Sequence, residues 1–225
     1  MTIHEAYQSG RVRFMGLELV IARGVLVPRE ETELLARTAL DVLKRLGGER
    51  PRIIDMCCGS GNLASVLAVH LPGAEVWASD LTDGAVAVAR QNVALLGLSQ
   101  RVHVHQGDLF AGLAGLALEG SVDAIVCNPP YISEKRLSGD RAQLLDNEPR
   151  EAFDGGPYGL SIHQRVIKDA LAFLKPGGHL MFEFGLGQEK QLKILFERGK
   201  VYEDVRLVSN AAGEPRVALG RKKAL

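Results

Sequence analysis

A short polar segment, Asn128-Pro129-Pro130-Tyr131, follows directly on an apolar run at residues 122–127. Proline ends a strand because it has no N–H group to donate, so a turn is expected here. A turn alone does not need an aromatic residue after two prolines. The Asn128 amide oxygen and the Pro129 carbonyl are two rigid acceptors that suit the two hydrogens of a planar –NH2 group, and Tyr131 adds an aromatic wall. The segment is therefore interpreted as a site that holds an amine or amide nitrogen.

Three acidic residues occupy comparable positions, each at the end of an apolar run. Asp55 precedes a glycine-containing turn at residues 57–61, where small residues let the backbone approach a ligand closely. Asp80 can accept hydrogen bonds from both hydroxyls of a ribose. Asp108 can accept from an exocyclic amine such as that of adenine. Each could be an ordinary loop residue when considered alone, but together with the NPPY segment they indicate S-adenosylmethionine and a nitrogen acceptor.

The elements that must position these residues alternate along the chain, because helical spacing of apolar residues alternates with short apolar runs. The pattern predicts strands over 52–57, 74–79, 101–106, 122–127, 177–184, 203–209 and 215–221, and helices within 28–48 and over 62–71, 83–98 (with Asp83 as N-cap), 160–174 and 189–199. This alternation predicts an α/β fold with a doubly wound, mainly parallel seven-stranded sheet. In such sheets ligands bind beyond the carboxyl ends of the strands.

Length and composition predict a single domain over residues 1–225, since 46% of the residues are hydrophobic. We divide it into a leading segment at 1–27, a capping helix at 28–48 and a Rossmann-like core at 49–225. The 27 basic and 27 acidic residues balance, which argues against a general nucleic-acid or membrane-surface binder.

The three cysteines, Cys57, Cys58 and Cys127, are an odd number in apolar contexts, which favours free thiols in a reducing compartment. They show no zinc-binding spacing, so no metal is expected. The N-terminus does not have the pattern of a signal peptide, and no apolar run approaches the roughly 18 residues of a membrane span. The sequence therefore predicts a cytoplasmic protein.

Longer blocks of the chain carry a family resemblance. They are FMGLELVIARGVLVPREETELL, IIDMCCGSGNLA, NPPY, EPREAFDGGPYGL, FEFGLGQ and AAGEPRVALGR. NPPY alone is shared with DNA and RNA adenine methyltransferases, whereas the PREETE and EPREAFDGG blocks are more specific. From about residue 10 to the C-terminus, the chain resembles the release-factor glutamine N5-methyltransferases, which are class I S-adenosylmethionine-dependent methyltransferases.

The resemblance implies a role for each matching residue. Gly59 and Gly61 would cradle the methionine end of S-adenosylmethionine, with Asp55 near its amino group. Asp80 would hold the ribose. Asp108 and Leu109 would hold the adenine. The other cofactor-binding residues that the resemblance implies are Thr32, Cys57, Leu81 and Asn128. The acceptor would be held by Asn128, Pro129, Pro130, Tyr131 and Glu33, of which Asn128, Pro129 and Tyr131 would be catalytic.

The chain departs from the family pattern at three places. Cys57 stands where the family usually has the first loop glycine, and Tyr158 stands where it usually has Asp. Only about nine residues precede the match, where the family has a helical domain that docks the release factor. We therefore expect weak methylation of a release factor in the absence of a helper chain, and residues 133–157 to line the acceptor pocket.

The expected activity is methylation of a planar amide or amine nitrogen, with release-factor glutamine as the family default. The alternative is a small-molecule methyltransferase of specialised metabolism. A nucleic-acid adenine methyltransferase and a module that binds the cofactor without chemistry are less favoured, because the charge is balanced and the NPPY segment is intact. The sequence does not identify the acceptor or a general base. It also leaves open whether a separate helper chain supplies the docking domain and whether the protein forms a homo-oligomer.

Overall fold

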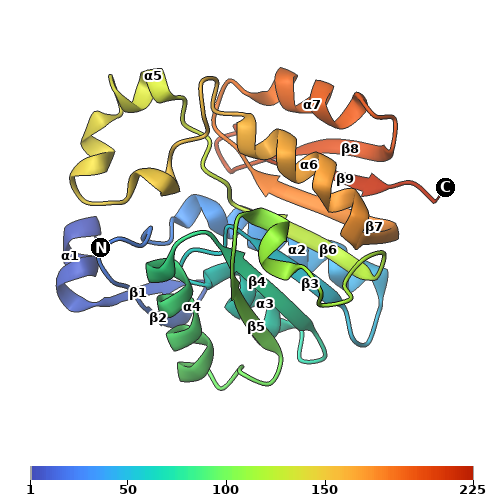
Figure 1. Cartoon of the computed structure of the whole chain (residues 1–225), viewed down its shortest axis with the longest axis horizontal. Helices are drawn as coiled ribbons and strands as arrows, with labels where there is room; N and C mark the ends of the chain where they lie inside the picture. The colour runs from blue at the N-terminus through green and yellow to red at the C-terminus, as the bar shows by residue number, and fades with distance from the viewer. Residues whose placement is uncertain (1, 225) are drawn as a thin grey trace.

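The centre of the molecule is a seven-stranded sheet, seen in the computed structural model, which describes residues 2–224 (Figure 1). Its strands, in the order β5-β4-β3-β6-β7-β9-β8, are β3 (Arg52–Met56), β4 (Glu75–Asp80), β5 (Val102–Gln106), β6 (Val122–Cys127), β7 (Leu174–Glu183), β8 (Tyr202–Ser209) and β9 (Pro215–Lys222). The first five in that order pair in parallel, and β9 runs antiparallel to both of its neighbours. The predicted doubly wound, mainly parallel sheet is confirmed.

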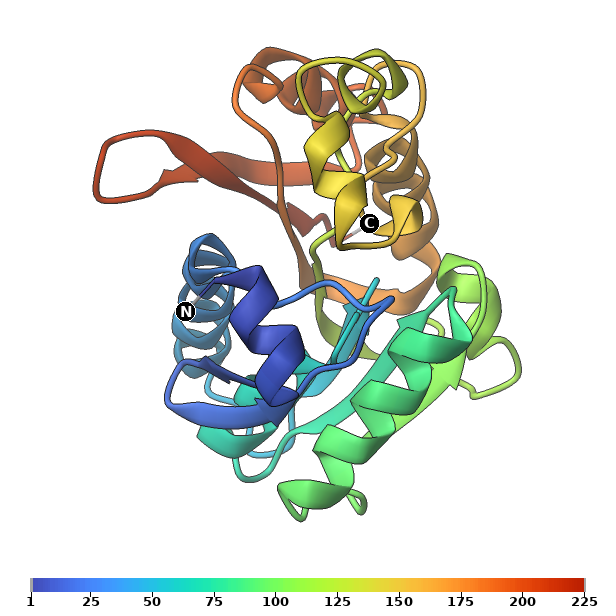
Figure 2. The same cartoon turned by 90° about the vertical axis from the view of Figure 1, so that its left-hand side faces the viewer.

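Helices cover both faces of the sheet, because each face is apolar and must be buried (Figure 2). The helices are α1 (Ile3–Ser9), α2 (Glu33–Leu46), α3 (Asn62–His70), α4 (Asp83–Leu95), α5 (Glu134–Leu137), α6 (Ser161–Phe173) and α7 (Glu189–Glu197). One apolar cluster joins α1, α2, α3 and α4 to one face through residues such as Leu35, Leu67 and Val88. A second joins α6 and α7 to the other face through Val166, Phe182 and Phe196.

The leading segment has structure of its own that the sequence did not predict. Helix α1 is followed by a hairpin of two four-residue strands, β1 (Arg11–Phe14) and β2 (Leu17–Val20). Buried Asn92 on α4 binds both the N–H and the carbonyl of Val20, at 2.6 and 2.9 Å. The same amide donates to the Ser60 carbonyl at 2.9 Å. Asn92 thus ties the hairpin to the glycine turn that follows β3.

Several local predictions differ from the structure; β7, for example, begins at Leu174, three residues earlier than predicted. The N-cap of α4 is Thr82, whose hydroxyl accepts from the Ala85 N–H, and Asp83 is the first residue of the helix, so its prediction as N-cap was wrong. Strand β3 ends at Met56, one residue earlier than predicted, because Cys57 adopts a left-handed backbone with φ of 58°. A left-handed residue cannot continue a strand.

Within residues 2–224, no helix combines the length and the apolar character that a membrane crossing requires.

Candidate functional site

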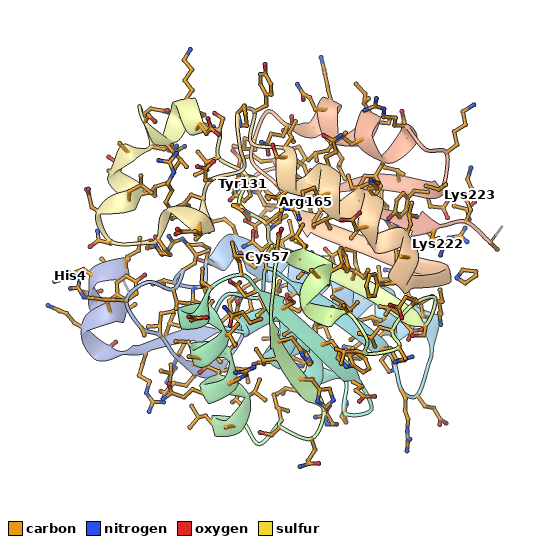
Figure 3. The ribbon with its side chains drawn as sticks, in the orientation of Figure 1. His4, Cys57, Tyr131, Arg165, Lys222 and Lys223 are labelled. Carbon is orange, nitrogen blue, oxygen red and sulfur yellow. The ribbon has the colours of Figure 1, made fainter. Side chains whose placement is uncertain are left out.

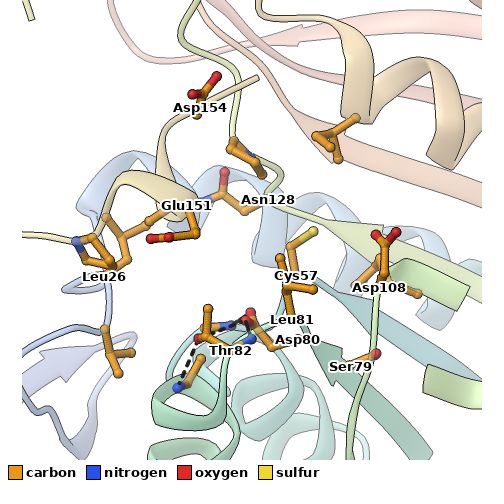
Figure 4. A pocket seen from close by; sticks show the side chains of 18 of the residues that line it. Leu26, Cys57, Ser79, Asp80, Leu81, Thr82, Asp108, Asn128, Glu151 and Asp154 are labelled. Atoms are coloured by element: carbon orange, nitrogen blue, oxygen red, sulfur yellow. Dashed lines mark hydrogen bonds between the residues drawn. The ribbon is translucent and has the colours of Figure 1, made fainter. Parts of the chain in front are cut away.

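The carboxyl ends of β3, β4, β5 and β6 surround a cavity of about 400 Å³. Figure 4 shows Asp80 and Thr82 on one side of this space, Asn128 on the opposite side, and Asp108 at one end. Leu26 and Glu151 lie at the other end. The parallel strands thus gather polar side chains from widely separated parts of the sequence, as predicted from the strand ends. We call this space the cofactor cavity.

Asp55 lies beneath the glycine turn and is fully buried. Its Oδ2 accepts from the Ala64 N–H in the first turn of α3 at 2.9 Å, whereas Oδ1 has no partner among the described residues. Burial raises the pKa of Asp55 to about 8; the Ala64 N–H opposes this rise and the charge of Asp80 adds to it. An unpartnered carboxylate oxygen in a buried site suits a cationic ligand group such as an ammonium.

Asp80 organises the loop above it. Its Oδ2 accepts from the Gly59 N–H at 2.9 Å, and its Oδ1 accepts from the Thr82 N–H at 3.1 Å. Oδ1 also accepts from the Thr82 hydroxyl at 3.4 Å, whereas Oδ2 has one partner and can accept a further hydrogen bond from a ribose hydroxyl. Gly61 closes the turn at φ of 74°, and an added Cβ would lie only 3.1 Å from the Ala89 side chain, so any other residue would be strained there.

Asp108 lines the same cavity, but it also has a protein partner. Its Oδ2 accepts from the Arg165 guanidinium of α6 at 2.8 Å. This hydrogen bond raises the pKa of Arg165. The neighbouring Leu109 has a left-handed backbone with φ of 52° and lies in the cavity lining, as does Leu81. One oxygen of Asp108 remains for a ligand amine.

Cys57 lies at the junction of the cavity and the sheet. It lines the cofactor cavity, whereas Cys58 and Cys127 are buried. Burial raises the pKa of the Cys58 and Cys127 thiols well above the usual value, so both stay protonated. Figure 3 shows Cys57, Tyr131 and Arg165 in the middle of the view, with His4 and Lys223 towards its two sides.

A second cavity, of about 510 Å³, adjoins the first. It is lined by Asn128, Pro129 and Tyr131, with Glu183 and Gln188 beside them. Residues of the 133–157 loop, including Ser133, Arg136, Arg141, Leu144 and Phe153, also line it. Asn128 lines both cavities, together with Leu26 and Ala152. We call this second space the acceptor cavity.

The Asn128 side chain is held in one orientation. Its Nδ2 donates to the Thr32 hydroxyl at 3.1 Å, and its Oδ1 accepts no hydrogen bond from any described residue. The Pro129 carbonyl likewise accepts none within residues 2–224. Two free carbonyl acceptors therefore lie at the same turn, which is the arrangement that a primary amide needs for its two N–H groups.

The two residues predicted from the PREETE block separate in the structure. Thr32 is buried against Asn128 and Glu183. Glu33, one residue later, accepts from the Met15 N–H and pairs with Arg37, and it lines a groove beside α1 and the hairpin. Neither Thr32 nor Glu33 lines the cofactor cavity or the acceptor cavity.

Several wall residues of the cofactor cavity were not assigned to it from the sequence, although residues 149–152 belong to the segment expected at the acceptor pocket. The segment at 24–26 and the segment at 149–152 face the strand ends across the cofactor cavity. Buried Glu148 joins them, since it accepts from the Val27 N–H at 3.0 Å and forms an ion pair with Arg29. Both segments lie in the blocks that carried the family resemblance, so those blocks were the available signal.

No group of three or more His, Cys, Asp or Glu side chains in the described range 2–224 could hold a metal ion.

Comparisons with known proteins agree with this geometry. Residues 31–156 match the family model of the methyltransferase small domain. The release factor glutamine methyltransferase of Moorella thermoacetica is 38% identical over 217 residues, which cover 96% of this chain and 74% of that protein. The ribosomal protein uL3 glutamine methyltransferase of Bradyrhizobium diazoefficiens is 36% identical over 190 residues, which cover 82% of this chain and 58% of that protein.

A solved structure is also similar. The release factor-specific protein-(glutamine-N5) methyltransferase of Alicyclobacillus acidocaldarius is 26% identical, with a TM-score of 0.52, and the match covers 88% of this chain and 94% of that one. The family model spans more than half of the chain, and the Moorella relative matches almost all of it. The resemblance inferred from the sequence blocks is therefore confirmed: the chain belongs to the release factor glutamine methyltransferase family and is an S-adenosylmethionine-dependent methyltransferase.

Proposed function

We propose that this enzyme transfers a methyl group from S-adenosylmethionine to the side-chain amide nitrogen of a glutamine in a protein of the translation apparatus. The observation that carries the proposal is the position of Asn128, which lines both the cofactor cavity and the acceptor cavity. A nitrogen held by Asn128 and the Pro129 carbonyl would lie where the two cavities meet.

The residues at the strand ends fit S-adenosylmethionine. Asp55 is buried beside the cofactor cavity and does not line it, but its unpartnered Oδ1 suits the ammonium of the methionine moiety, and Asp80, which lines the cavity, suits the ribose. Asp108 and Leu109 suit the adenine, with Leu81 beside them. When bound, S-adenosylmethionine supplies an electrophilic methyl group on a sulfonium, which is a strong leaving group.

The protein's own contribution would be to position and polarise the acceptor. An amide nitrogen is a weak nucleophile because its lone pair is delocalised into the carbonyl. Hydrogen bonds from its two N–H groups to Asn128 Oδ1 and the Pro129 carbonyl would favour the positive charge that develops on nitrogen. Alignment of two reactants can itself lower a barrier by roughly 7–11 kcal/mol. Tyr131 would close one wall of the acceptor cavity.

The known relatives support a protein acceptor. Relatives named for glutamine in release factors and in ribosomal protein uL3 are both similar to this chain, so a small-molecule acceptor, the alternative expected from the sequence, is not favoured. A release factor is the first candidate because the relative named for it matches the larger share of the chain.

The test is to incubate the purified enzyme with methyl-deuterated S-adenosylmethionine and, separately, a bacterial release factor and ribosomal protein uL3. Peptide mass spectrometry should find one labelled glutamine in one of these proteins, and no label when that glutamine is replaced by asparagine or when the enzyme carries Asn128→Ala. Label on a residue other than glutamine, or no label although calorimetry shows cofactor binding, would refute the proposal.

A further inference from the structure

A buried glutamate lies directly behind the NPPY segment. Glu183 is the last residue of β7, the strand that neighbours β6, and the preceding residue Phe182 pairs with Cys127. Its side chain is buried. A carboxylate in such a place must be compensated by donors, because an unpaired buried charge is strongly destabilising.

The donors come from two distant parts of the chain, and of the two only Tyr131 lines the acceptor cavity. Thr32 Oγ1 donates to Glu183 Oε2 at 2.7 Å, and the Tyr131 hydroxyl donates to Oε1 at 3.1 Å. Thr32 Oγ1 in turn accepts from Asn128 Nδ2 at 3.1 Å. The start of α2, the NPPY segment and the end of β7 thus meet in one chain of hydrogen bonds, from Asn128 through Thr32 and Glu183 to Tyr131.

The direction of these hydrogen bonds has a chemical consequence. A hydroxyl group carries one proton, so when Thr32 donates to Glu183 it presents only lone pairs to Asn128. Only the NH2 end of the Asn128 amide can bind there, and the oxygen end must face the acceptor cavity. If Thr32 were free to donate to Asn128, the Asn128 amide could turn over and direct its NH2 group at the substrate. Two NH2 groups would then face each other, and since both are donors no hydrogen bond could form between them.

We propose that Glu183 is a positioning residue that sets the hydrogen-bond direction of the acceptor site, so that Asn128 presents an acceptor oxygen to the substrate's –NH2 group. That this –NH2 group belongs to a glutamine amide rests on the proposed function. Glu183 does not touch the reacting atoms; it acts through Thr32 on Asn128 and holds the Tyr131 ring by its hydroxyl. Because Asn128 then offers an acceptor oxygen, the site selects a primary amide, which can donate, over a group that only accepts hydrogen bonds.

The surroundings of Glu183 supply its electrostatic balance. Burial raises the pKa of Glu183, while the hydrogen bonds from Thr32 and Tyr131 and the charge of Arg216 oppose the rise, and Glu31 adds to it. The strand end itself is supported by buried His163, whose Nε2 lies 2.9 Å from the Glu183 carbonyl. Burial lowers the pKa of His163 to about 4, so this histidine is neutral at pH 7 and donates to the carbonyl.

The test uses the full chain with Glu183→Gln, Thr32→Val, the double variant, and Thr32→Ser as the matched control that keeps the hydroxyl. A glutamine amide can donate to Thr32 and reverse the chain, and valine removes the hydroxyl while keeping the shape. Each of the two single variants should lower kcat for the glutamine-containing substrate by about 100-fold, with S-adenosylmethionine affinity within about threefold of the wild type. Thr32→Ser should keep kcat within about threefold.

The double variant separates positioning from mere packing. Because both residues act through the orientation of one amide, the double variant should be no slower than the slower single variant, whereas independent packing defects would multiply. Multiplying losses, or near wild-type kcat in folded Glu183→Gln and Thr32→Val variants, would overturn the inference. Should Glu183→Gln fail to fold, Thr32→Val compared with Thr32→Ser tests whether Asn128 needs a hydroxyl that accepts from it, and near wild-type kcat in Thr32→Val would overturn the inference.

A second measurement needs no substrate. The Asn128 side-chain NH2 resonance, assigned by its absence in Asn128→Ala, should be protected from hydrogen exchange in the wild type and lose that protection in Thr32→Val and Glu183→Gln. If the wild type labels no glutamine but shows this pattern, the proposed function fails and the role of Glu183 stands. An Asn128 resonance that is equally protected in all variants would refute that role.

Discussion

The buried carboxylate of Asp55 predicts a measurable coupling between cofactor binding and protonation. With a pKa of about 8 in the unliganded protein, Asp55 is about 90% protonated at pH 7. If Asp55 Oδ1 receives the ammonium of S-adenosylmethionine, the carboxyl group must ionise as the cofactor binds. Binding at pH 7 should then release ~0.9 proton from Asp55 and take up ~0.1 at the α-amine, which titrates near pH 8. The expected net release is ~0.8 proton per cofactor.

The assay is titration calorimetry at pH 7 in two buffers of different ionisation enthalpy, repeated across the pH range. Affinity should rise by about tenfold per pH unit from pH 5 to pH 7, level off near pH 8, and fall above it as the α-amine loses its proton. Asp55→Asn keeps the shape and an acceptor for the Ala64 N–H. It should abolish the proton release and lower the affinity at pH 8 by at least about tenfold, the value of one charged hydrogen bond.

The same group predicts the pH dependence of stability in the unliganded protein. The folded-state pKa of Asp55 is raised above its ordinary value of 3.8, so its contribution to stability is full below pH 4 and is lost as the pH rises through about 8. The loss amounts to ~6 kcal/mol in the free energy of unfolding across that window. Asp55→Asn should remove this dependence.

Wild-type binding with no proton release, or unchanged release in Asp55→Asn, would refute the placement of the ammonium beside Asp55.

Three further predictions concern single positions. Asn128→Ala should lower kcat by about 100-fold or more while cofactor affinity, measured by calorimetry, stays within a few fold, and normal turnover would mean that NPPY is only a turn. Asp80→Ala should weaken cofactor binding by at least about tenfold, and Asp80→Asn by less, because asparagine keeps one acceptor for the ribose or the Gly59 N–H. Cys57→Gly should be about 1 kcal/mol more stable to denaturant than Cys57→Ala, because only glycine is unstrained at φ of 58°; equal stabilities would contradict this.

The order of strands and helices was predictable because it is written in local periodicity. The apolar runs of the sheet and the helical spacing of α2, α4 and α6 depend on neighbours within a few residues, so the sequence is enough to find them. The polar residues at the strand ends were predictable for a related reason. Parallel strands bring their carboxyl ends to one edge, so Asp80 and Asn128 had to line one cavity, with Asp55 buried close enough to Asp80 for the charge of Asp80 to raise its pKa.

Short elements and cap positions were less accessible. The hairpin of β1 and β2 has only four residues in each strand, too few to show a clear alternation, and it is held by Asn92 from a distant helix. At the start of α4, Thr82 and Asp83 are both good N-caps by residue type. The choice of Thr82 depends on the path of the chain as it leaves β4, where Asp80 binds the Thr82 N–H.

The sequence by itself determined the sheet, its order of elements and the NPPY site, because these follow from local pattern and from the geometry of parallel strands. Only the tertiary structure decided which residues of the site act on one another. Adjacent Thr32 and Glu33 point to different places, one to Asn128 and Glu183 and the other to the groove beside α1. The contact of Thr32 with Glu183 joins positions 151 residues apart. Such contacts depend on how whole elements pack, since no local preference encodes the partner of a buried hydroxyl or carboxylate.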